Sequence, residues 1–258
     1  MKTVWRMLRA RLAIRLVYRA DFVVNALGDL LLAAVGLVFL STLFRHIPKL
    51  ADWSMHEVLF CWGFAEAVVG LFFVCFQGLY VLNQRYILGG ELDRVLLRPA
   101  DPYLQVLADN VSLEDLPIFI LGLAVMAVAG QDLAPLPAYR WLLAPLFVLA
   151  GTGVLGGVLT AVSSTGFLLF HRGTTVGLVF QLSVFNRYPL DLFARPLRHF
   201  LTFLLPIGFA GFYPASLFLS QSRWYPWAWA TPGVALVALA GGYAIWTRSL
   251  RHYTSSGH

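Results

Sequence analysis

Charged side chains that could bind a partner gather in one stretch of a largely apolar chain, GGELDRVLLRPADPYLQVLADN at residues 89–110. This stretch holds four acids, two arginines and two prolines. Gly89 and Gly90 end a helical stretch, and Pro99 and Pro102 prevent a single long helix. The intervening ELDRVLL can form about two helical turns, with Leu92, Val95 and Leu96 on one side. A short element that is polar and apolar together suits docking to a soluble protein, and an ordinary surface loop is the alternative interpretation.

A polar stripe lies at the start of the first apolar run. Asp21, Asn25 and Asp29 are spaced four residues apart, so they share one helix face. Asp21 suits the N-cap. Asp29 lies about two turns into the run, where a charge costs roughly 2.5–3.5 kcal/mol. We therefore expect Asp29 to face protein, water or a basic partner such as Arg19 or Arg85. Pairing within the structure and a role in a transport pathway both remain open.

Glu66 is the deepest acid, near the middle of the next apolar run. A hydrogen-bonded contact between helices is the first interpretation, and a proton relay or cation site is the second. The sequence has no phosphate-binding Gly-Lys-Ser/Thr loop, no His-Glu-x-x-His and no Gly-x-Ser-x-Gly. The six histidines are scattered along the chain. We therefore assign no catalytic residue and no metal site.

The composition predicts that the elements holding these residues lie in a membrane. Of 258 residues, 59% are hydrophobic and only 12% are charged, against about 25% charged residues in average soluble domains. A bilayer accepts an apolar surface that a soluble protein could not cover. We predict an all-α polytopic membrane protein with one domain, residues 1–258, surrounded by membrane lipids and without a nucleic-acid partner.

Apolar runs of about 20 residues predict membrane crossings. They cover roughly 22–44, 56–82, 113–130, 141–170 and 226–247. Between the last two runs the pattern is irregular, and two interpretations fit. Either 174–186 is a short fifth span and 187–225 dips into the bilayer from outside, or 174–186 inserts partly and 199–220 crosses. Non-helical backbone at that depth must be covered by protein or line a cavity, so this region is a candidate for lining a pathway.

The basic residues predict the orientation. Residues 1–20 carry six of them beside an apolar stripe at helical spacing, so we predict an amphipathic helix on the cytoplasmic membrane surface. With this end inside and six crossings, the inside segments hold twelve Lys and Arg and the outside segments hold seven. That bias agrees with the positive-inside rule. Arg187, Arg195 and Arg198 are an anomaly, because this topology places them outside or partly buried.

Small residues mark one face of the fourth run. Gly153, Gly157 and Ala161 are spaced four residues apart, which predicts that another helix approaches closely there. Such packing would serve a monomer and a dimer alike and specifies no ligand.

Three motifs carry a family resemblance that covers essentially the whole chain. GGELDRVLLRPADPY resembles the cytoplasmic loop of ABC-2-type permeases, the six-span membrane subunits of bacterial ABC exporters, in which a Gly, an acid, a Leu-Leu pair and Arg-Pro recur. YPLDLF followed by LLPIGFAGFYPASLFL is similar to a second hallmark, a Tyr-Pro near the fifth span and a Pro-rich apolar segment ending in Tyr-Pro-Ala. YRADF before the first run also fits.

The resemblance implies an N-terminal interfacial helix, six spans, and re-entrant segments between the fifth and sixth spans that face outside. It thereby favours 174–186 as the fifth span. It implies a bacterial inner-membrane protein with both termini in the cytoplasm. The 83–112 loop would carry a coupling helix that docks in a groove of the ATPase. The docking residues carried over are Glu91, Leu92, Asp93, Arg94, Leu96, Leu97, Arg98 and Pro99.

The resemblance also implies an exporter subunit rather than an enzyme. Two permease subunits, identical or related, would pack together with the pathway at their interface. Separate ATPase subunits would bind ATP and Mg²⁺, so this chain would hold no cofactor itself. The candidates for pathway or gate are Asp29, Glu66, Tyr188, Pro189, Asp191, Tyr213 and Pro214.

Other functional classes compete with this interpretation. An ion- or proton-coupled secondary transporter would use Asp29 and Glu66, although such proteins usually show hydropathy repeats and this sequence shows none. An intramembrane enzyme would need a convergent set of catalytic groups. A non-transporting membrane scaffold is the third alternative.

The substrate is not specified by the sequence. Aromatic residues such as Phe72, Phe73, Phe76 and Tyr80 would suit a pathway for lipid-like or amphipathic, drug-like molecules. Aromatic residues on a span more often face lipid or pack against other helices.

Overall fold

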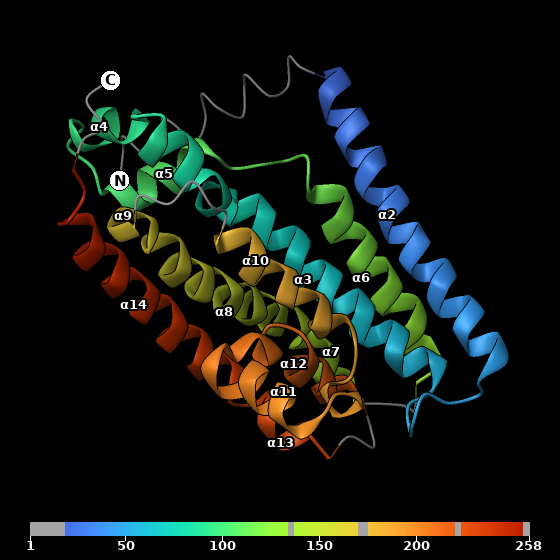
Figure 1. Cartoon of the computed structure of the whole chain (residues 1–258). Helices are drawn as coiled ribbons and strands as arrows, with labels where there is room; N and C mark the ends of the chain where they lie inside the picture. The colour runs from blue at the N-terminus through green and yellow to red at the C-terminus, as the bar shows by residue number, and fades with distance from the viewer. Residues whose placement is uncertain (1–18, 134–136, 170–174, 220–222, 255–258) are drawn as a thin grey trace.

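The computed structural model describes residues 19–133, 137–169, 175–219 and 223–254, and this part of the chain is almost entirely helical (Figure 1). Its one β-type contact is an isolated bridge between Leu50 and Trp53. The predicted all-α class is thus confirmed for these residues. The predicted amphipathic helix at residues 1–20 falls almost wholly outside them.

Four long apolar helices form the frame of the molecule. They are α2 (Arg19–His46), α3 (Met55–Val81, continued by the π-helix η1, Leu82–Leu88), α8 (Ala144–Ser164, followed by α9, Gly166–Leu169) and α14 (Thr231–Leu250). Each contains a stretch long and apolar enough to cross a membrane. All four coincide with predicted spans. A fifth apolar helix, α6 (Leu116–Gln131), lies between α3 and α8 in the chain. It has 16 residues, fewer than the roughly 20 that a straight crossing takes.

The described region between α9 and α14 contains no long straight helix. α10 (Thr175–Gln181) and η2 (Leu182–Arg187) pack beside α8 and α3. Two limbs, Arg195–Leu204 and Pro206–Phe218, then meet at 73°. By length, the described helices supply four spans, or five if the two limbs form one broken span, so the predicted count of six is not confirmed.

Proline explains why this region breaks into short helices, because proline cannot continue a helix from its interior. Five prolines fall between residues 189 and 226. The resulting elements are η3 (Leu190–Leu192), α11 (Arg195–His199), η4 (Phe200–Leu204), η5 (Pro206–Phe209), α12 (Phe212–Ala215), η6 (Ser216–Phe218) and α13 (Tyr225–Ala228).

These short helices gather at one end of the bundle, beside α7 (Ala138–Leu142) and the loop that joins α2 to α3 (Figure 1). Arg140 on α7 donates a hydrogen bond to the carbonyl oxygen of Leu217 at 3.5 Å. The guanidinium of Arg198 lies over the ring of Trp224, 5.2 Å from its centroid. At the opposite end lie α4 (Glu91–Leu96) and α5 (Pro102–Asp109), near the described C-terminal residues.

Two pairs of helices make the closest backbone contacts in the core, α3 with α6 and α8 with α14. A Cβ on Gly122 would collide with the backbone of Ala67, and one on Gly157 would collide with the backbone of Ala238. Gly242 on α14 likewise meets the carbonyl oxygen of Gly157. The predicted small-residue face of α8 therefore packs on α14.

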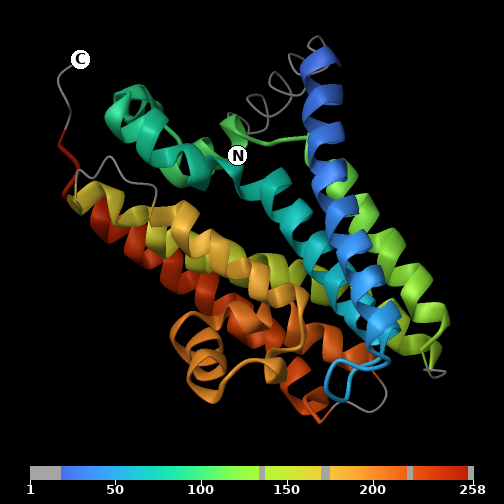
Figure 2. The ribbon, with the colours of Figure 1, turned by 45° about the vertical axis from the view of Figure 1, so that its right-hand side comes forward.

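α2 lies at the side of the molecule, against α6 and α3 (Figure 2). Most of its large apolar side chains are exposed, including Val24, Leu31 and Leu32. Their apolar surface suits a helix that faces lipid or another membrane protein.

Candidate functional site

Two glycines shape the start of the charged stretch. A Cβ on Gly89 would lie 2.5 Å from the carbonyl oxygen of Arg85. Gly90 has φ 69°, a left-handed conformation that glycine adopts without the strain imposed by a side chain. The chain turns here and begins α4, whose Leu92 and Val95 are buried. One apolar side therefore anchors α4 to the rest of the protein.

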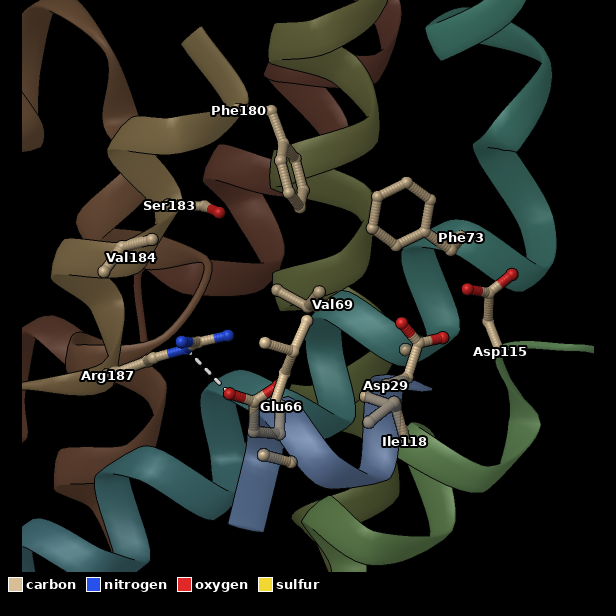
Figure 3. Close-up of a pocket in the computed structure, with 13 residues that line it drawn as sticks. Asp29, Glu66, Val69, Phe73, Asp115, Ile118, Phe180, Ser183, Val184 and Arg187 are labelled. Atoms are coloured by element: carbon tan, nitrogen blue, oxygen red, sulfur yellow. Dashed lines mark ion pairs between the residues drawn. The ribbon is translucent and has the colours of Figure 1, made fainter. Parts of the chain in front are cut away.

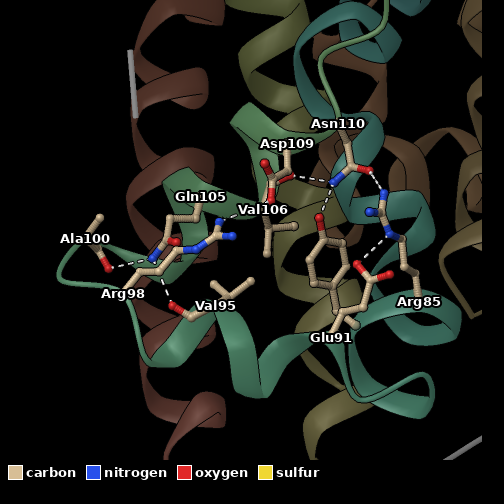
Figure 4. A network of polar contacts seen from close by, with 10 residues as sticks. Arg85, Glu91, Val95, Arg98, Ala100, Gln105, Val106, Asp109 and Asn110 are labelled. Atoms are coloured by element: carbon tan, nitrogen blue, oxygen red, sulfur yellow. Dashed lines mark hydrogen bonds and ion pairs between the residues drawn. The ribbon is translucent and has the colours of Figure 1, made fainter. Parts of the chain in front are cut away.

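A polar network connects the first turn of α4 to the residues that precede and follow it in the chain (Figure 4). Arg85 Nε donates to Glu91 Oε2 at 2.8 Å, and Arg85 Nη1 donates to Asn110 Oδ1 at 3.0 Å. The amide of Asn110 donates to the hydroxyl oxygen of Tyr86 at 2.6 Å. Glu91 is thereby fixed in place by the end of the preceding span.

A buried glutamine holds the end of α4. The amide of Gln105 donates to the carbonyl oxygens of Val95 at 3.1 Å and Ala100 at 2.9 Å. Arg98 Nη1 also lies 3.9 Å from Asp109 Oδ2. The carbonyl oxygen of Val95 also accepts from the backbone N–H of Arg98 at 3.3 Å, so the Gln105 amide adds a side-chain anchor to the end of α4 and to the turn that follows it.

The other side of α4 and the turn that follows it face outward. Leu97 is 86% exposed and Leu96 is also exposed. Of the eight predicted docking residues, Leu92 is buried, Glu91 and Asp93 are half-buried, and the exposed ones are Arg94, Leu96, Leu97, Arg98 and Pro99.

Two tyrosines connect the loop to the long helices. The hydroxyl groups of Tyr103 and Thr160 lie 3.0 Å apart, linking α5 to α8. The hydroxyl of Tyr243 on α14 donates to Asp101 Oδ2 at 2.6 Å. Burial raises the pKa of Tyr103, so its hydroxyl stays neutral and can keep this hydrogen bond. The loop is therefore joined to the α8–α14 pair.

The segment after α14 also reaches α4. Burial raises the pKa of Tyr253 to about 12, and the negative charge of Asp93 on α4 adds to this rise. The ring of Tyr253 packs edge-on against Phe167 of α9, with centroids 6.3 Å apart. The C-terminal segment thus lies between α4 and the end of the α8 span.

A second polar site lies inside the bundle, in a cavity of about 400 Å³ lined by α2, α3, α6, α10 and η2 (Figure 3). Glu66 is 3% exposed, and its Oε1 lies 2.7 Å from Arg187 Nε. The contact is an ion pair without hydrogen-bond geometry. A buried carboxylate is costly without such a partner. The structure therefore differs from the first interpretation of Glu66, a hydrogen-bonded contact between helices, because an arginine of η2 pairs with it.

The cavity holds two further carboxylates, Asp29 and Asp115. Asp29 has no ion-pair or hydrogen-bond partner within the described part of the chain. The predicted contact with Arg85 is not formed, because Arg85 binds Glu91 and Asn110 instead. The side chain of Arg19 is outside the described residues.

A third cluster joins the loop after α2 to the short helices. Asp191 accepts hydrogen bonds from the indole nitrogens of Trp53 at 3.0 Å and Trp224 at 3.3 Å, and from Arg223 Nη2 at 3.2 Å.

Of the seven predicted pathway or gate residues, two line the cavity, Asp29 and Glu66. The other five do not line it: Tyr188, Pro189, Asp191, Tyr213 and Pro214.

The sequence motifs did not indicate three residues of the cavity, Arg187, Asp115 and Phe180. Arg187 did carry a signal, because it is one of the three arginines that the predicted topology placed outside or partly buried. Asp115 and Phe180 carried none, since an acid before a helix and an aromatic residue within one are ordinary.

Comparison with known protein families identifies the family of the chain. A family model described as ABC-2 family transporter protein matches residues 30–257. The match includes the whole 83–112 loop and the ion pair of Glu66 and Arg187, and it begins one residue after Asp29. No curated protein and no solved structure matches the chain.

Proposed function

The chain belongs to the ABC-2 family of transporter proteins, and from this membership we propose that it is the membrane subunit of an ATP-binding cassette exporter that docks its ATPase through α4. Separate ATPase subunits would bind ATP and Mg²⁺. The pathway would form where two permease subunits, identical or related, pack together in a bacterial inner membrane. The end of the bundle that carries α4 would then be cytoplasmic.

The position of α4 supports this role. The apolar stretch Met55–Leu88 has 34 residues, which span about 51 Å at 1.5 Å per residue. The hydrocarbon core of a bilayer is about 30 Å thick. α4 begins after this stretch, so it would lie outside the hydrocarbon, where a soluble subunit can reach it.

The single observation that carries the proposal is a pair of exposed leucines at the end of a short helix that the rest of the chain holds in place. Leu96 and Leu97 are exposed, although the hydrogen bonds of Gln105 and the buried Leu92 fix the helix that presents them. Full burial of one leucine side chain stabilises a complex by about 1.5–3 kcal/mol. An exposed pair held this firmly is suited to fill a groove in a partner without first being ordered.

The loop is also placed to transmit motion. Its contacts through Tyr103 and Tyr243 join it to α8 and α14. A displacement of α4 by the ATPase would therefore act on these two helices through α5 and its N-cap Asp101. The ion pair of Glu66 with Arg187 weighs against the secondary transporter, because a relay carboxylate must be free to exchange its proton.

The test is co-expression of the chain with its neighbouring genes, followed by co-purification of the chain with an ATP-binding cassette ATPase. We expect Leu97→Asp to abolish the association, because a charge would replace an exposed apolar side chain, and to leave the yield of folded permease unchanged, because the side chain contacts little of its own chain. Leu97→Met is the matched control and should retain the ATPase. A Leu97→Asp permease that brings down the ATPase in normal amount would contradict the assignment of α4.

A further inference from the structure

The cavity beside Glu66 has the size and position of a ligand site. Its volume of about 400 Å³ falls in the range of roughly 300–1,000 Å³ found for small-molecule pockets. Glu66 lies eleven residues into α3, about 17 Å along the helix at 1.5 Å per residue. The cavity is therefore placed near the middle of the span rather than at its surface.

The charges around the cavity favour a cation. Among the described residues, its lining includes three carboxylates, Asp29, Glu66 and Asp115, and one cationic side chain, Arg187. Arg187 is already paired with Glu66. Asp29 lies in the apolar layer without an attractive partner among those residues, and its ionised form is costly there. A positively charged ligand would relieve that cost.

The remaining walls favour an organic cation over a metal ion. No group of three His, Cys, Asp or Glu is arranged to hold a metal within the described part of the chain. Phe73 and Phe180 line the cavity with ring centroids 5.0 Å apart, and Tyr80 adjoins both rings. Aromatic faces attract organic cations, and a ligand with apolar groups would also fill the space between Val69 and Ile118.

We propose that this cavity binds a lipophilic organic cation, of the quaternary ammonium or phosphonium type, with its charge toward Asp29 and its apolar groups on Phe73 and Phe180 (Figure 3). The inference deepens the proposed function by naming the class of molecule exported, and it rests on that function only for the direction of transport. Binding itself requires only this chain.

The test uses two probes of nearly equal shape and opposite charge. The purified full-length chain in neutral detergent is dialysed against tetraphenylphosphonium or tetraphenylborate, and saturable binding is measured. We expect saturable binding of the phosphonium and none of the borate. Asp29→Asn should weaken phosphonium binding at least about tenfold, the factor that corresponds to 1.4 kcal/mol. Phe73→Leu, which keeps the apolar volume but removes the ring, should weaken it several-fold.

Asp132→Asn is the matched control, because Asp132 is an exposed acid that pairs with His56 and does not line this cavity. It should bind the phosphonium as the unmodified chain does. Absence of saturable phosphonium binding, equal binding of the borate, or equal affinity in Asp29→Asn would overturn the proposal. Co-purification of the ATPase does not depend on Asp29, so failure of cation binding would be distinguishable from failure of the proposed function.

Discussion

Arg187 Nε lies 2.7 Å from Oε1 of Glu66, so the end of η2 is tied to the middle of α3. Glu66 is almost fully buried, whereas Arg187 is about one-third exposed and borders the cavity. The carboxylate therefore depends on a partner that arrives from a different part of the chain. Through this pair η2 is fixed against α3 and lines the cavity.

Breaking this pair from one side should destabilise the protein more than removing it altogether. In Arg187→Gln the Glu66 carboxylate loses its partner. Such a loss costs about 3–5 kcal/mol of unfolding free energy for a fully buried pair, and the cost is smaller here because about a third of Arg187 is exposed. In the double variant Glu66→Gln with Arg187→Gln no buried charge is stranded. We expect the thermal midpoint of the purified chain to fall most for Arg187→Gln and to recover partly in the double variant. Equal losses that simply add in the double variant would show that the two side chains do not interact.

Gly90 should tolerate no side chain without loss of stability. Its φ of 69° lies in the left-handed region, where an L-residue costs about 1–2 kcal/mol. Gly90→Ala should therefore lower the thermal midpoint. Gly241→Ala is the control, because a Cβ at Gly241 in α14 meets open space and alanine favours a helix over glycine by about 0.5–1 kcal/mol. The prediction is wrong if both substitutions shift the midpoint in the same direction and by the same amount.

The pKa of Tyr253 makes the contact of the C-terminal segment with α4 measurable. Burial, with Asp93 adding to it, raises this pKa from about 10 to about 12. Because the raised value favours the neutral hydroxyl in the folded state, the stability from this group is complete below pH 10 and is lost between pH 10 and pH 12. The absorbance difference between the unmodified chain and Tyr253→Phe should titrate near pH 12.

Asp93→Asn provides the control for that titration. Its neutral amide removes one of the causes of the raised pKa, so the midpoint for Tyr253 should move down toward the ordinary value. A midpoint that does not move would show that the carboxylate of Asp93 is too far away to act on this hydroxyl.

The local pattern of apolar residues was sufficient to predict the four long helices. The apolar runs indicated α2, α3, α8 and α14, because about 20 consecutive apolar residues leave few alternatives to a membrane helix. The predicted end of the second run, at residue 82, agrees with the end of α3 at Val81, but the continuation of the helix beyond it was not predicted. The polar residues from Asn83 to Arg85 resemble a loop, yet they form the π-helix η1, which continues to Leu88 and ends at Gly89.

The candidate site was predictable only in part, because half of it depends on tertiary packing. The composition of the 89–110 stretch indicated a short helix between glycines and prolines, and α4 is that helix. The predicted apolar side of this helix is correct for Leu92 and Val95, which are buried, and wrong for Leu96, which is exposed. The partner of Glu66 was equally hidden, because Arg187 comes close only through the packing of η2 on α3.

The close contact between α8 and α14 limits which residues related sequences can have at two positions. A methyl group at Gly157 would collide with the backbone of Ala238, and one at Gly242 would collide with the carbonyl oxygen of Gly157, so any inherited change at either glycine would force two backbones apart. Neighbouring positions on the lipid side of these helices face no such limit. Among relatives that share this architecture, we expect glycine to be retained at these two positions and the exposed apolar positions to vary. A comparison of such sequences can check this expectation.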